Sequence, residues 1–562
     1  MFIIVKKTAE DFAKEQKEIS VSEFFEKNKH LLGFDNPTKA LMMTVKEAVD
    51  NALDACQDAG IVPDITVKIK QSGEDKYVVS VQDNGPGIVK EQIGRIFGKL
   101  LYGSKFHKLR QSRGQQGIGI SAVVLYSQLT TGNPAKVWSK VESKKKTHYF
   151  EMHLNTMKNE PEVIKEEDID YAVLGESGIK IEITVVGRYR KTIEDYLKQT
   201  SIANPFAKIN FTSPDGTKIT YPRSINELPK EPKIMKPHPY GMEFGTLQRM
   251  LHNSSSRTLQ SFMTNEFSSV GAQTAKELCK VAKLDANSKP ESLDRDAIEK
   301  VMNAVQKVKI QRPPLDCLSP IGESELEKSL RKEYPNAEFI TTITREPTVY
   351  RGFPFMIEAG IVYDEKDIEV DDEKKKGDAI DVLRIANRVP LLYQSGACAT
   401  IEAVKDVDWK RYGLSQSANS LPTGPVKVVI HMCSVWVPFI SESKEAIAPY
   451  PDIVKEMKLA IQDAGRNFSR FLSGRRRAGE QKRRVQIFER YANEVANSIA
   501  GLTGKQEKEI EKKLLGMIKN RVKIIEKEIE EENNKNGVNN ESNKEETKKD
   551  EKPKQEKIKE KK

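Results

Sequence analysis

A glutamate and an asparagine one helical turn apart, Glu47 and Asn51, are the residues of this sequence best suited to chemistry on a bound ligand. Apolar residues recur at helical spacing between positions 44 and 60 and predict an amphipathic helix. Both side chains fall on its polar face, which also carries three aspartates, Asp50, Asp54 and Asp58. That face offers a carboxylate base and an amide oxygen to one ligand. Taken alone, the segment fits a solvated surface helix better.

A strand that ends in a glycine turn forms the second motif. Residues 77–81 are β-branched or aromatic and predict a strand, which leads into Asp83 and the turn glycines Gly85 and Gly87. Glycine permits positive φ angles and close backbone approach. A carboxylate at the strand end can accept a hydrogen bond from an adenine amino group. Without the first motif, this string would be an ordinary turn.

A glycine-rich basic stretch, residues 98–119, supplies a third motif and precedes an apolar helix predicted near residues 121–129. Bare amides of a glycine turn at a helix N-terminus form an anion site, and nearby cations strengthen it. A mobile surface loop has the same composition. The sequence contains no GxxxxGK[ST] string, which excludes a P-loop.

Composition limits the class of protein. The 562 residues predict three to four domains, and a formal net charge of +10 favours an anionic partner without identifying it. Five cysteines without CxxC spacing predict a reduced, cytoplasmic protein. The sequence has neither an apolar leader nor a run long enough to span a bilayer, so we expect no membrane association.

The chain predicts an α+β multidomain fold. Residues 1–228 form the expected nucleotide domain, with strands at 67–70, 77–81, 147–154 and 179–186. Prolines after 228 mark a boundary, and an all-helical insert is expected at 229–308. A mixed α/β region follows at 309–470, with strands at 339–344, 355–363 and 426–436. The last two expected parts are a basic helical segment at 471–530 and a charged, disordered tail at 531–562.

The order of the three motifs resembles the Bergerat-type ATP fold of gyrase B subunits, MutL-type mismatch-repair proteins, ninety-kilodalton heat-shock chaperones and histidine kinases. The resemblance implies ATP and Mg²⁺ as cofactors, with Glu47 as the general base and Asn51 as the metal ligand. Asp83 would hold the adenine. The implied pocket and phosphate lid comprise Gly85, Gly87, Ser104, Lys105, Gly114, Gln115, Gln116, Gly117, Ile118 and Gly119. The family's Gly-Thr pair is Gly178-Ile179 here, so the missing hydroxyl would have to come from Ser177 or Thr184.

Three strings give a narrower resemblance, to the B subunits of archaeal type IIB topoisomerases (topoisomerase VI), over about residues 1–525. They are RIANRVPLLYQSG at 384–396, WKRYG at 409–413 and TGPVKVVIH at 423–431. This family has a Bergerat ATPase domain, a helix-two-turns-helix domain and a transducer domain with long C-terminal helices. It implies that Lys427 reaches the γ-phosphate, that Trp409, Lys410 and Tyr412 sense nucleotide or DNA, and that B chains dimerise on ATP in an A₂B₂ heterotetramer.

In the family the separate A subunit cleaves double-stranded DNA, so no tyrosine here is expected to be a nucleophile. Two basic clusters are candidate DNA contacts: Arg188 and Arg190, and a denser group that includes Arg475, Arg476 and Arg477. Solvated faces, or a surface packing cluster for the WKRY string, remain alternatives. A chaperone ATPase, a mismatch-repair clamp and a DNA-binding scaffold are competing functions. A histidine kinase would need a phosphoacceptor, and His30, the histidine preceding Glu47, lacks a dimerisation-helix context.

Overall fold

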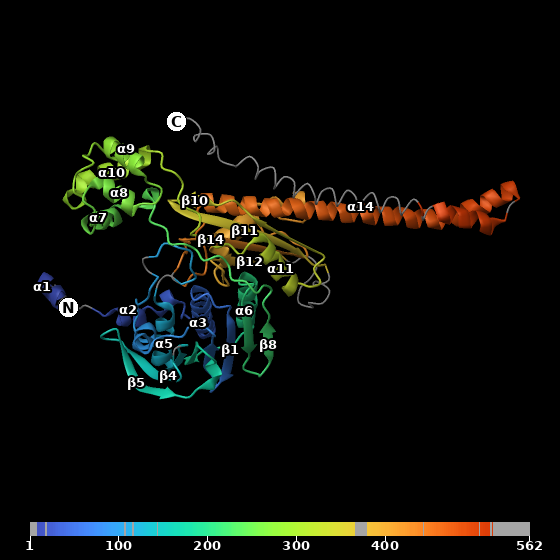
Figure 1. Cartoon of the computed structure of the whole chain (residues 1–562). Helices are drawn as coiled ribbons and strands as arrows, with labels where there is room; N and C mark the ends of the chain where they lie inside the picture. The colour runs from blue at the N-terminus through green and yellow to red at the C-terminus, as the bar shows by residue number, and fades with distance from the viewer. Residues whose placement is uncertain are drawn as a thin grey trace, which may run out of the picture. The chain divides into compact units, whose positions relative to one another are not determined.

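The computed structural model describes residues 8–16, 19–105, 108–114, 117–142, 144–365, 379–441, 443–504, 506–517 and 520. The chain divides into two compact units, residues 1–466 and 467–562. The first contains two β-sheets with their packed helices and a separate group of helices (Figure 1). The α+β multidomain class is therefore confirmed, whereas the predicted tail at 531–562 lies outside the described residues.

The helix predicted around Glu47 is α3, Pro37–Asp58. It begins earlier than the apolar pattern suggested because Asn36 accepts the backbone N–H of Lys39 at 2.9 Å and Pro37 occupies the first turn. The apolar stripe is buried as expected: Val45, Ala48, Val49, Ala52, Leu53 and Cys56. The polar face is less exposed than predicted, since Asp50 and Asp54 are buried too.

α3 packs against an eight-stranded sheet. Its strands are β1 Asp64–Gln71, β2 Lys76–Gln82, β3 Ala135–Lys140, β4 Thr147–Asn155, β5 Glu160–Ile169, β6 Gly178–Val186, β7 Lys208–Thr212 and β8 Lys218–Tyr221. They lie in the order β5-β4-β3-β6-β2-β1-β7-β8, and the β1–β7 pair is parallel. Packed with α3 against the sheet are α4 Lys90–Gly98, α5 Gly119–Thr131 and α6 Thr192–Ala203. The remaining short helices of this part are α1 Ala9–Glu15, α2 Val21–Lys27, η1 Lys29–Leu32 and η2 Ala172–Leu174.

A group of helices follows the proline-rich stretch. Its members are η3 Pro239–Gly241, α7 Phe244–His252, α8 Leu259–Glu266, α9 Ala272–Ala282, η4 Pro290–Ser292 and α10 Arg295–Lys307. Thr258 and Ser261 form a capping box at the start of α8, in which each side chain accepts the backbone N–H of the other residue. The side chain of Asp294 caps α10. These helices bury their own apolar core, which extends from Leu247 to Ile310. They fall in the stretch for which we expect a helical insert, and the exact domain limits stay predictions.

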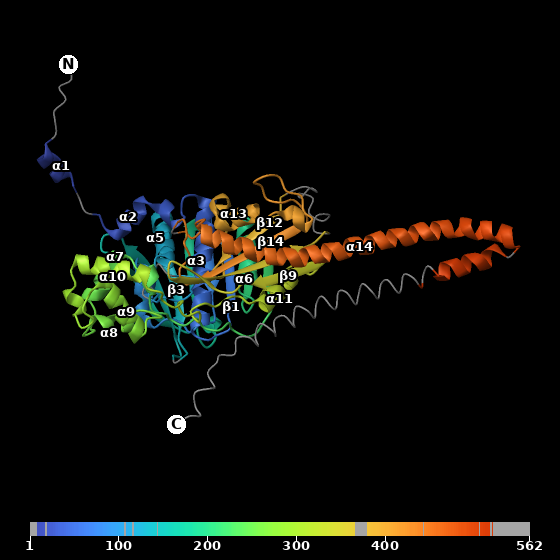
Figure 2. The same cartoon turned by 90° about the horizontal axis from the view of Figure 1, so that it is seen from above.

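The second sheet has six strands, β9 Phe339–Thr344, β10 Thr348–Tyr350, β11 Phe353–Tyr363, β12 Asp381–Ala386, β13 Val389–Pro390 and β14 Val426–Ser434. β11 pairs with β9, β10 and β14, and β12 pairs in parallel with β14. α11, Glu323–Glu333, lies beside β9 (Figure 2). The shorter helices here are η5 Ser395–Ala397, α13 Ala399–Asp406 and η6 Trp409–Tyr412.

The long helix α14, Pro451–Thr503, begins in the first unit and continues into the second. Within the first unit Arg345 holds it by bonds to Glu456 at 3.1 Å and Asp463 at 2.7 Å. In the second unit, another helical stretch covers residues 507–517. No helix among the described residues has both the length and the apolar character needed to cross a bilayer. All five cysteines lie in the described part as buried thiols without disulfides.

Candidate functional site

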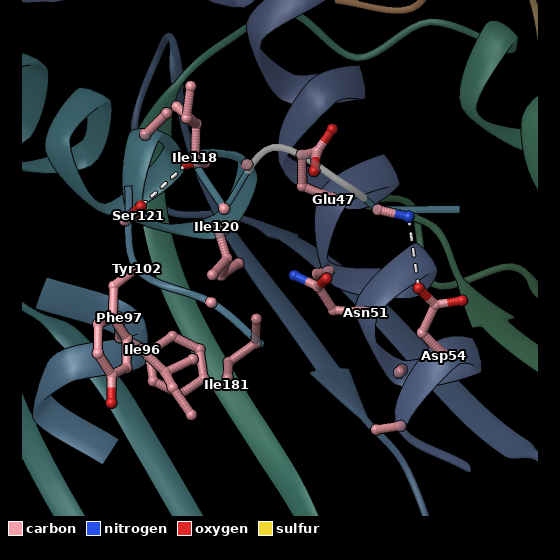
Figure 3. A pocket seen from close by; sticks show the side chains of 18 of the residues that line it. Glu47, Asn51, Asp54, Ile96, Phe97, Tyr102, Ile118, Ile120, Ser121 and Ile181 are labelled. Atoms are coloured by element: carbon pink, nitrogen blue, oxygen red, sulfur yellow. Dashed lines mark hydrogen bonds between the residues drawn. The ribbon is translucent and has the colours of Figure 1, made fainter. Parts of the chain in front are cut away.

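A cavity of about 610 Å³ lies between α3, the start of α5 and the eight-stranded sheet (Figure 3). Ten of the residues assigned to the pocket line it: Glu47, Asn51, Asp83, Gly87, Ser104, Lys105, Gly114, Gly117, Ile118 and Gly119. One side is apolar, with Ile96, Phe97 and Ile181, while Glu47, Asn51 and Asp54 follow one another along α3 on the other side. The cavity thus has a place for a flat ring and a polar end for charged groups.

Glu47 lies against the first residue of α5. A Cβ at Gly119 would come within 1.8 Å of Glu47 Oε2, so a larger residue there would displace the carboxylate. Behind it, the buried ammonium of Lys46 lies 3.5 Å from Glu47 Oε1 and 3.5 Å from Asp50 Oδ2. Burial lowers the pKa of Lys46, but the two carboxylates outweigh burial and raise that pKa above its usual value.

Asp83 lies at the apolar end, where β2 stops. Its Oδ1 accepts the N–H of Gly85 at 2.9 Å and that of Ile179 at 3.2 Å. Burial raises the pKa of Asp83 to about 6, although the two amide hydrogen bonds oppose the rise. Since both bonds end on Oδ1, the second oxygen is available in geometry to a ligand amino group.

Glycine is required beside Asp83 because other backbone comes close. A Cβ at Gly87, where φ is 74°, would lie 2.1 Å from the carbonyl oxygen of Lys140. Gly85 does not line the cavity but holds Asp83 through its N–H. Of the candidate hydroxyls, neither Ser177 nor Thr184 lines the cavity, whereas Ser121 does and donates to the carbonyl of Ile118 at 3.0 Å.

The polar end is formed by the N-terminus of α5. Gly119, Ile120, Ser121 and Ala122 open this helix and line the cavity. The free amides and the dipole of a helix N-terminus favour an anion there. Gly117 precedes it with φ of 59°. Gln115 and Gln116, also assigned to the lid, lie outside the described residues.

Asp54 pairs with two cations at the polar end of the cavity, a role that the sequence did not predict. Its Oδ2 is 2.6 Å from Lys105 Nζ, and its Oδ1 is 2.7 Å from Arg113. Burial would raise the pKa of Asp54, but the two cations lower it to about 2. Lys105 therefore lines the cavity as the partner of a carboxylate.

Lys427, which the resemblance assigns to the γ-phosphate, does not line the cavity in this structure. Lys427 lies on β14, where its Nζ is 3.3 Å from Asp381 and 5.5 Å from the ring centre of Tyr334. Another lysine of the same region, Lys444, lines the cavity. Its Nζ donates to the carbonyl of Arg113 at 2.9 Å. The signal that favours Lys444 is its place in a polar loop after β14, since loops carry binding residues more often than strands.

Burial lowers the pKa of Lys444, the positive charge of Lys46 adds to this effect, and the charge of Glu47 opposes it. The lysine and the glutamate therefore share one end of the cavity. Their opposite charges suit an anionic ligand that is attacked at this end.

The candidate DNA contacts lie elsewhere. Arg188 and Arg190 are exposed between β6 and α6. Arg475, Arg476 and Arg477 are exposed on α14 in the second unit. In the WKRY string, Trp409 is fully buried and donates to the carbonyl of Val404 at 2.8 Å, so it packs inside the protein. Lys410 and Arg411 of the same string are exposed.

Comparison with known proteins agrees with this geometry. A family model described as "Topoisomerase VI B subunit, transducer" matches residues 313–484. One described as "Histidine kinase-, DNA gyrase B-, and HSP90-like ATPase" matches residues 36–157, which include Glu47, Asn51 and Asp83. The two matches cover most of the residues that line the cavity, including Lys444.

Several relatives that align with most of the chain are named as the B subunit of type 2 DNA topoisomerase 6. The protein of Methanococcoides burtonii is 48% identical over 85% of this chain and 75% of its own length. That of Methanosarcina barkeri is 46% identical over 89% and 80%. The Pyrococcus horikoshii protein is 36% identical over 92% and 98%. The chain belongs to the B subunit family of type IIB DNA topoisomerases.

Proposed function

We propose that this chain is the ATP-hydrolysing subunit of a type II DNA topoisomerase, in which ATP binding closes two copies around a DNA duplex and hydrolysis reopens them. The observation that carries the proposal is the convergence of Glu47, Asn51 and Lys444 at one end of a cavity whose other end holds Asp83. A base, an oxygen ligand for a cation and an ammonium group meet there beside a helix N-terminus. This set suits cleavage of a terminal phosphate.

Glu47 is the proposed general base. Its side chain lines the cavity, and Lys46 Nζ lies 3.5 Å from its Oε1. A water between this carboxylate and a terminal phosphate would lose its proton to Glu47 during attack. The absence of a side chain at Gly119 leaves room for this carboxylate beside the N-terminus of α5.

Asn51 fits the expected Mg²⁺. Its side chain lines the cavity one helical turn from Glu47 and offers the hard oxygen ligand that this ion prefers. When bound, the ion would neutralise phosphate charge.

Lys444 is the proposed contact to the terminal phosphate. Its ammonium already reaches the cavity from the region of the second sheet, and it is anchored on the carbonyl of Arg113. Loss of the phosphate would remove the partner that holds this lysine, so hydrolysis changes the restraint between the two sheets. The proposed strand passage requires this link.

The second unit supports a proposed contact with an A subunit in an A₂B₂ assembly. α14 exposes large apolar side chains at helical spacing, namely Ile487, Phe488, Tyr491 and Val495. An exposed apolar stripe of this kind suits a partner protein. DNA phosphates would be bound by the exposed Arg188, Arg190 and Arg475–Arg477, without sequence preference. Buried free thiols suit the reducing cytoplasm in which we place the assembly.

Reconstitution with the cognate A subunit tests the function. We expect relaxation of supercoiled DNA and decatenation that require both subunits, ATP and Mg²⁺. The chain without its partner should hydrolyse ATP and leave DNA strands intact. Suppression of client aggregation without any relaxation would instead identify a chaperone ATPase, and mismatch-dependent recruitment of partners would identify a repair clamp.

Asp83 predicts a pH dependence of nucleotide binding. Because only its ionised form is a full acceptor for the adenine amino group, affinity should rise as pH increases through about 6. Asp83→Asn keeps an oxygen for the amides of Gly85 and Ile179 but loses the charge. We expect it to weaken binding roughly tenfold or more at pH 8 and to flatten the profile. Calorimetry from pH 5 to 8 measures this, and comparison with the variant subtracts the titration of the nucleotide itself.

The contribution of Asp83 to the stability of the fold changes with pH in the opposite direction to nucleotide affinity. Since the pKa of Asp83 rises from 3.8 to about 6 on folding, this group favours the folded state below pH 3.8, and that contribution is lost as pH rises through about 6. For the binding experiment, an equal nucleotide affinity of the wild type and Asp83→Asn at every pH would contradict the assignment of Asp83 to the adenine.

A further inference from the structure

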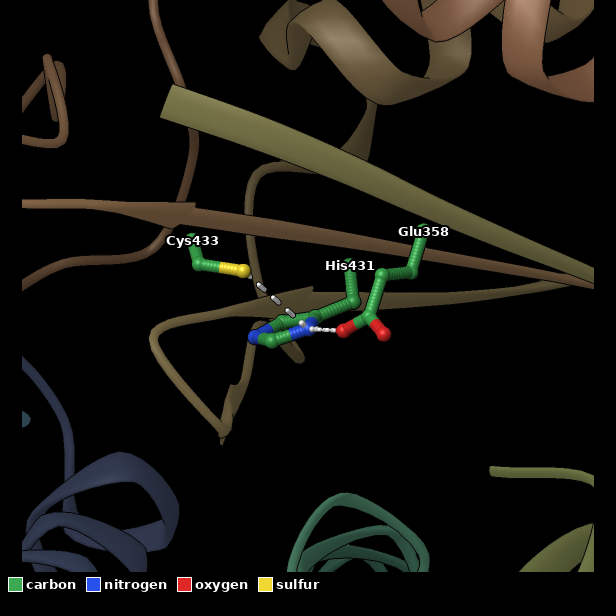
Figure 4. A group of neighbouring side chains, drawn as sticks. All are labelled: Glu358, His431 and Cys433. Carbon is green, nitrogen blue, oxygen red and sulfur yellow. Dashed lines mark hydrogen bonds and ion pairs between the residues drawn. The ribbon is translucent and has the colours of Figure 1, made fainter. Parts of the chain in front are cut away.

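Three buried side chains of the second sheet, Glu358, His431 and Cys433, lie together outside the cavity (Figure 4). Carboxylate, imidazole and thiol groups are ligands of zinc. However, His431 Nε2 accepts the backbone N–H of Arg388 at 3.0 Å, which leaves the ring proton on Nδ1, 2.6 Å from Glu358 Oε2. Both ring nitrogens are therefore engaged. The group is a hydrogen-bonded link, with no lone pair of the imidazole left for a metal.

Glu358 continues this link towards α11. Its two oxygens accept the N–H groups of Ile321 and Gly322, both at 2.8 Å, and the hydroxyl of Thr344 at 3.1 Å. Gly322 is the residue that precedes α11. One buried carboxylate thus joins the histidine of β14 to the segment that leads from the helical group into the second sheet.

The other end of the link is the turn Asn387-Arg388 between β12 and β13. Both residues have left-handed backbone, with φ of 47° and 65°, as a two-residue hairpin turn of type I′ requires. Arginine is uncommon at such an angle, so the position calls for an explanation. Asn387 Nδ2 donates to Ser434 of β14 at 2.9 Å and to Ser112 of the nucleotide domain at 3.2 Å.

Arg388 is held from three directions. Its N–H binds His431, and its carbonyl accepts Asn204 Nδ2, at the end of α6, at 3.1 Å. Its guanidinium donates to the carbonyls of Pro320 at 2.8 Å and Ser319 at 3.3 Å. The side chain is 3% exposed. A single buried residue therefore contacts the second sheet, the nucleotide domain and the segment that connects them.

The contacts continue from Asn204 to the cavity. Arg113 binds Asn204 Oδ1 with one end of its guanidinium and Asp54 with the other. The carbonyl of Arg113 accepts Lys444 Nζ. Asp54 and Lys444 both line the cavity, so an unbroken series of buried polar contacts runs from the cavity through Arg388 to Glu358.

We propose that Arg388 is a positioning residue that couples the nucleotide pocket to the second sheet, so that a change at Lys444 and Asp54 moves β14 and α11 together. The proposal rests on the nucleotide binding proposed above. Buried polar networks resist partial rearrangement, because a lost partner leaves a desolvated group unsatisfied. The contacts of Arg388 should therefore move as one body. Its guanidinium supplies the direct bonds to Ser319 and Pro320, so its removal should uncouple the segment that leads into α11 from the pocket.

Arg388→Gly tests the coupling. Glycine removes the guanidinium while it keeps the N–H and the carbonyl that bind His431 and Asn204, and it suits the left-handed backbone. Arg351→Gly is the matched control. Arg351 is exposed, has φ of 49° and occupies the turn between β10 and β11 of the same sheet, so only the buried contacts distinguish the two variants.

Hydrogen exchange is measured on the full chain with and without a non-hydrolysable ATP analogue. In the wild type and in Arg351→Gly, the analogue should slow exchange in α3 and change exchange in β14 and α11. In Arg388→Gly the effects on α3 and β14 should remain, because the N–H and the carbonyl of residue 388 are kept, while the effect on α11 should fall roughly tenfold. With the A subunit, relaxation events per ATP hydrolysed should fall by a similar factor, with little change in the KM for ATP.

A full nucleotide effect on α11 in Arg388→Gly would overturn the proposal. So would a rise in KM that accounts for the whole loss of relaxation, because it would show a damaged pocket. Absence of any analogue effect on α3 in the wild type would instead refute the proposed nucleotide binding. If Arg388→Gly does not fold, Arg388→Lys replaces it. Lysine keeps the positive charge but lacks the planar guanidinium that donates to two carbonyls, so we expect partial uncoupling. Wild-type behaviour of Arg388→Lys would overturn the proposal.

Discussion

Glu47→Gln is expected to lower the rate of ATP hydrolysis by about 10²- to 10⁴-fold, the range that a positioned general base contributes. Glutamine keeps the size of the side chain against Gly119, where a Cβ would already collide with the carboxylate. It cannot accept a proton from water at neutral pH. The measurement is steady-state phosphate release by the purified chain, with and without its A subunit.

Nucleotide affinity should change little in this variant, because the proposed adenine contact is Asp83 and the phosphate contacts come from α5 and Lys444. Glu91→Gln, a substitution of an exposed glutamate in the first turn of α4, is the control and should retain full turnover. Turnover by Glu47→Gln close to that of the wild type would show that another group activates water. Loss of binding together with turnover would show that Glu47 mainly shapes the pocket.

Such a variant would also trap the closed state. If ATP binding closes the dimer and hydrolysis opens it, Glu47→Gln with ATP should hold a circular DNA through a high-salt wash that releases it from the wild type. The reason is that the bound terminal phosphate keeps its contact with Lys444. This outcome would separate gate closure from hydrolysis.

Local periodicity explains what the sequence could predict. The stripe of α3 from Val45 to Cys56 is buried as its helical spacing indicated. The strands of the second sheet with β-branched runs, such as β9 and β11, also lie where they were expected. β5 was missed because it is an edge strand whose side chains are mostly exposed and acidic, so it lacks the alternation of a half-buried strand.

Contacts between distant residues explain what the sequence could not predict. Arg113 resembles a phosphate ligand in a glycine-rich loop, yet it binds Asp54, 59 positions away. Lys427 and Lys444 are both lysines of the same region, and apart from the loop position of Lys444 the sequence does not tell which one lines the cavity. Burial and pairing of this kind depend on the packing of two domains, which a single sequence does not show.

Lys444→Ala is expected to lower ATP turnover by about 10²- to 10³-fold, since it removes a positive charge from the place where negative charge grows in the transition state. Binding of ADP should be nearly unchanged, because ADP lacks the terminal phosphate that Lys444 is proposed to contact. Phosphate release and ADP titration of the same preparation measure the two quantities. The variant should also lose ATP-driven relaxation, since the link through Arg113 no longer includes the nucleotide.

Lys427→Ala is the matched control from the same region. Its ammonium pairs with Asp381, which is 44% exposed, and such pairs contribute little to stability. We expect turnover within about twofold of the wild type. The reverse result, with Lys427→Ala inactive and Lys444→Ala active, would mean that nucleotide binding rearranges the region after β14 and brings a different lysine to the phosphate. The pair of variants therefore decides whether the arrangement of the cavity seen here is the one that hydrolyses ATP.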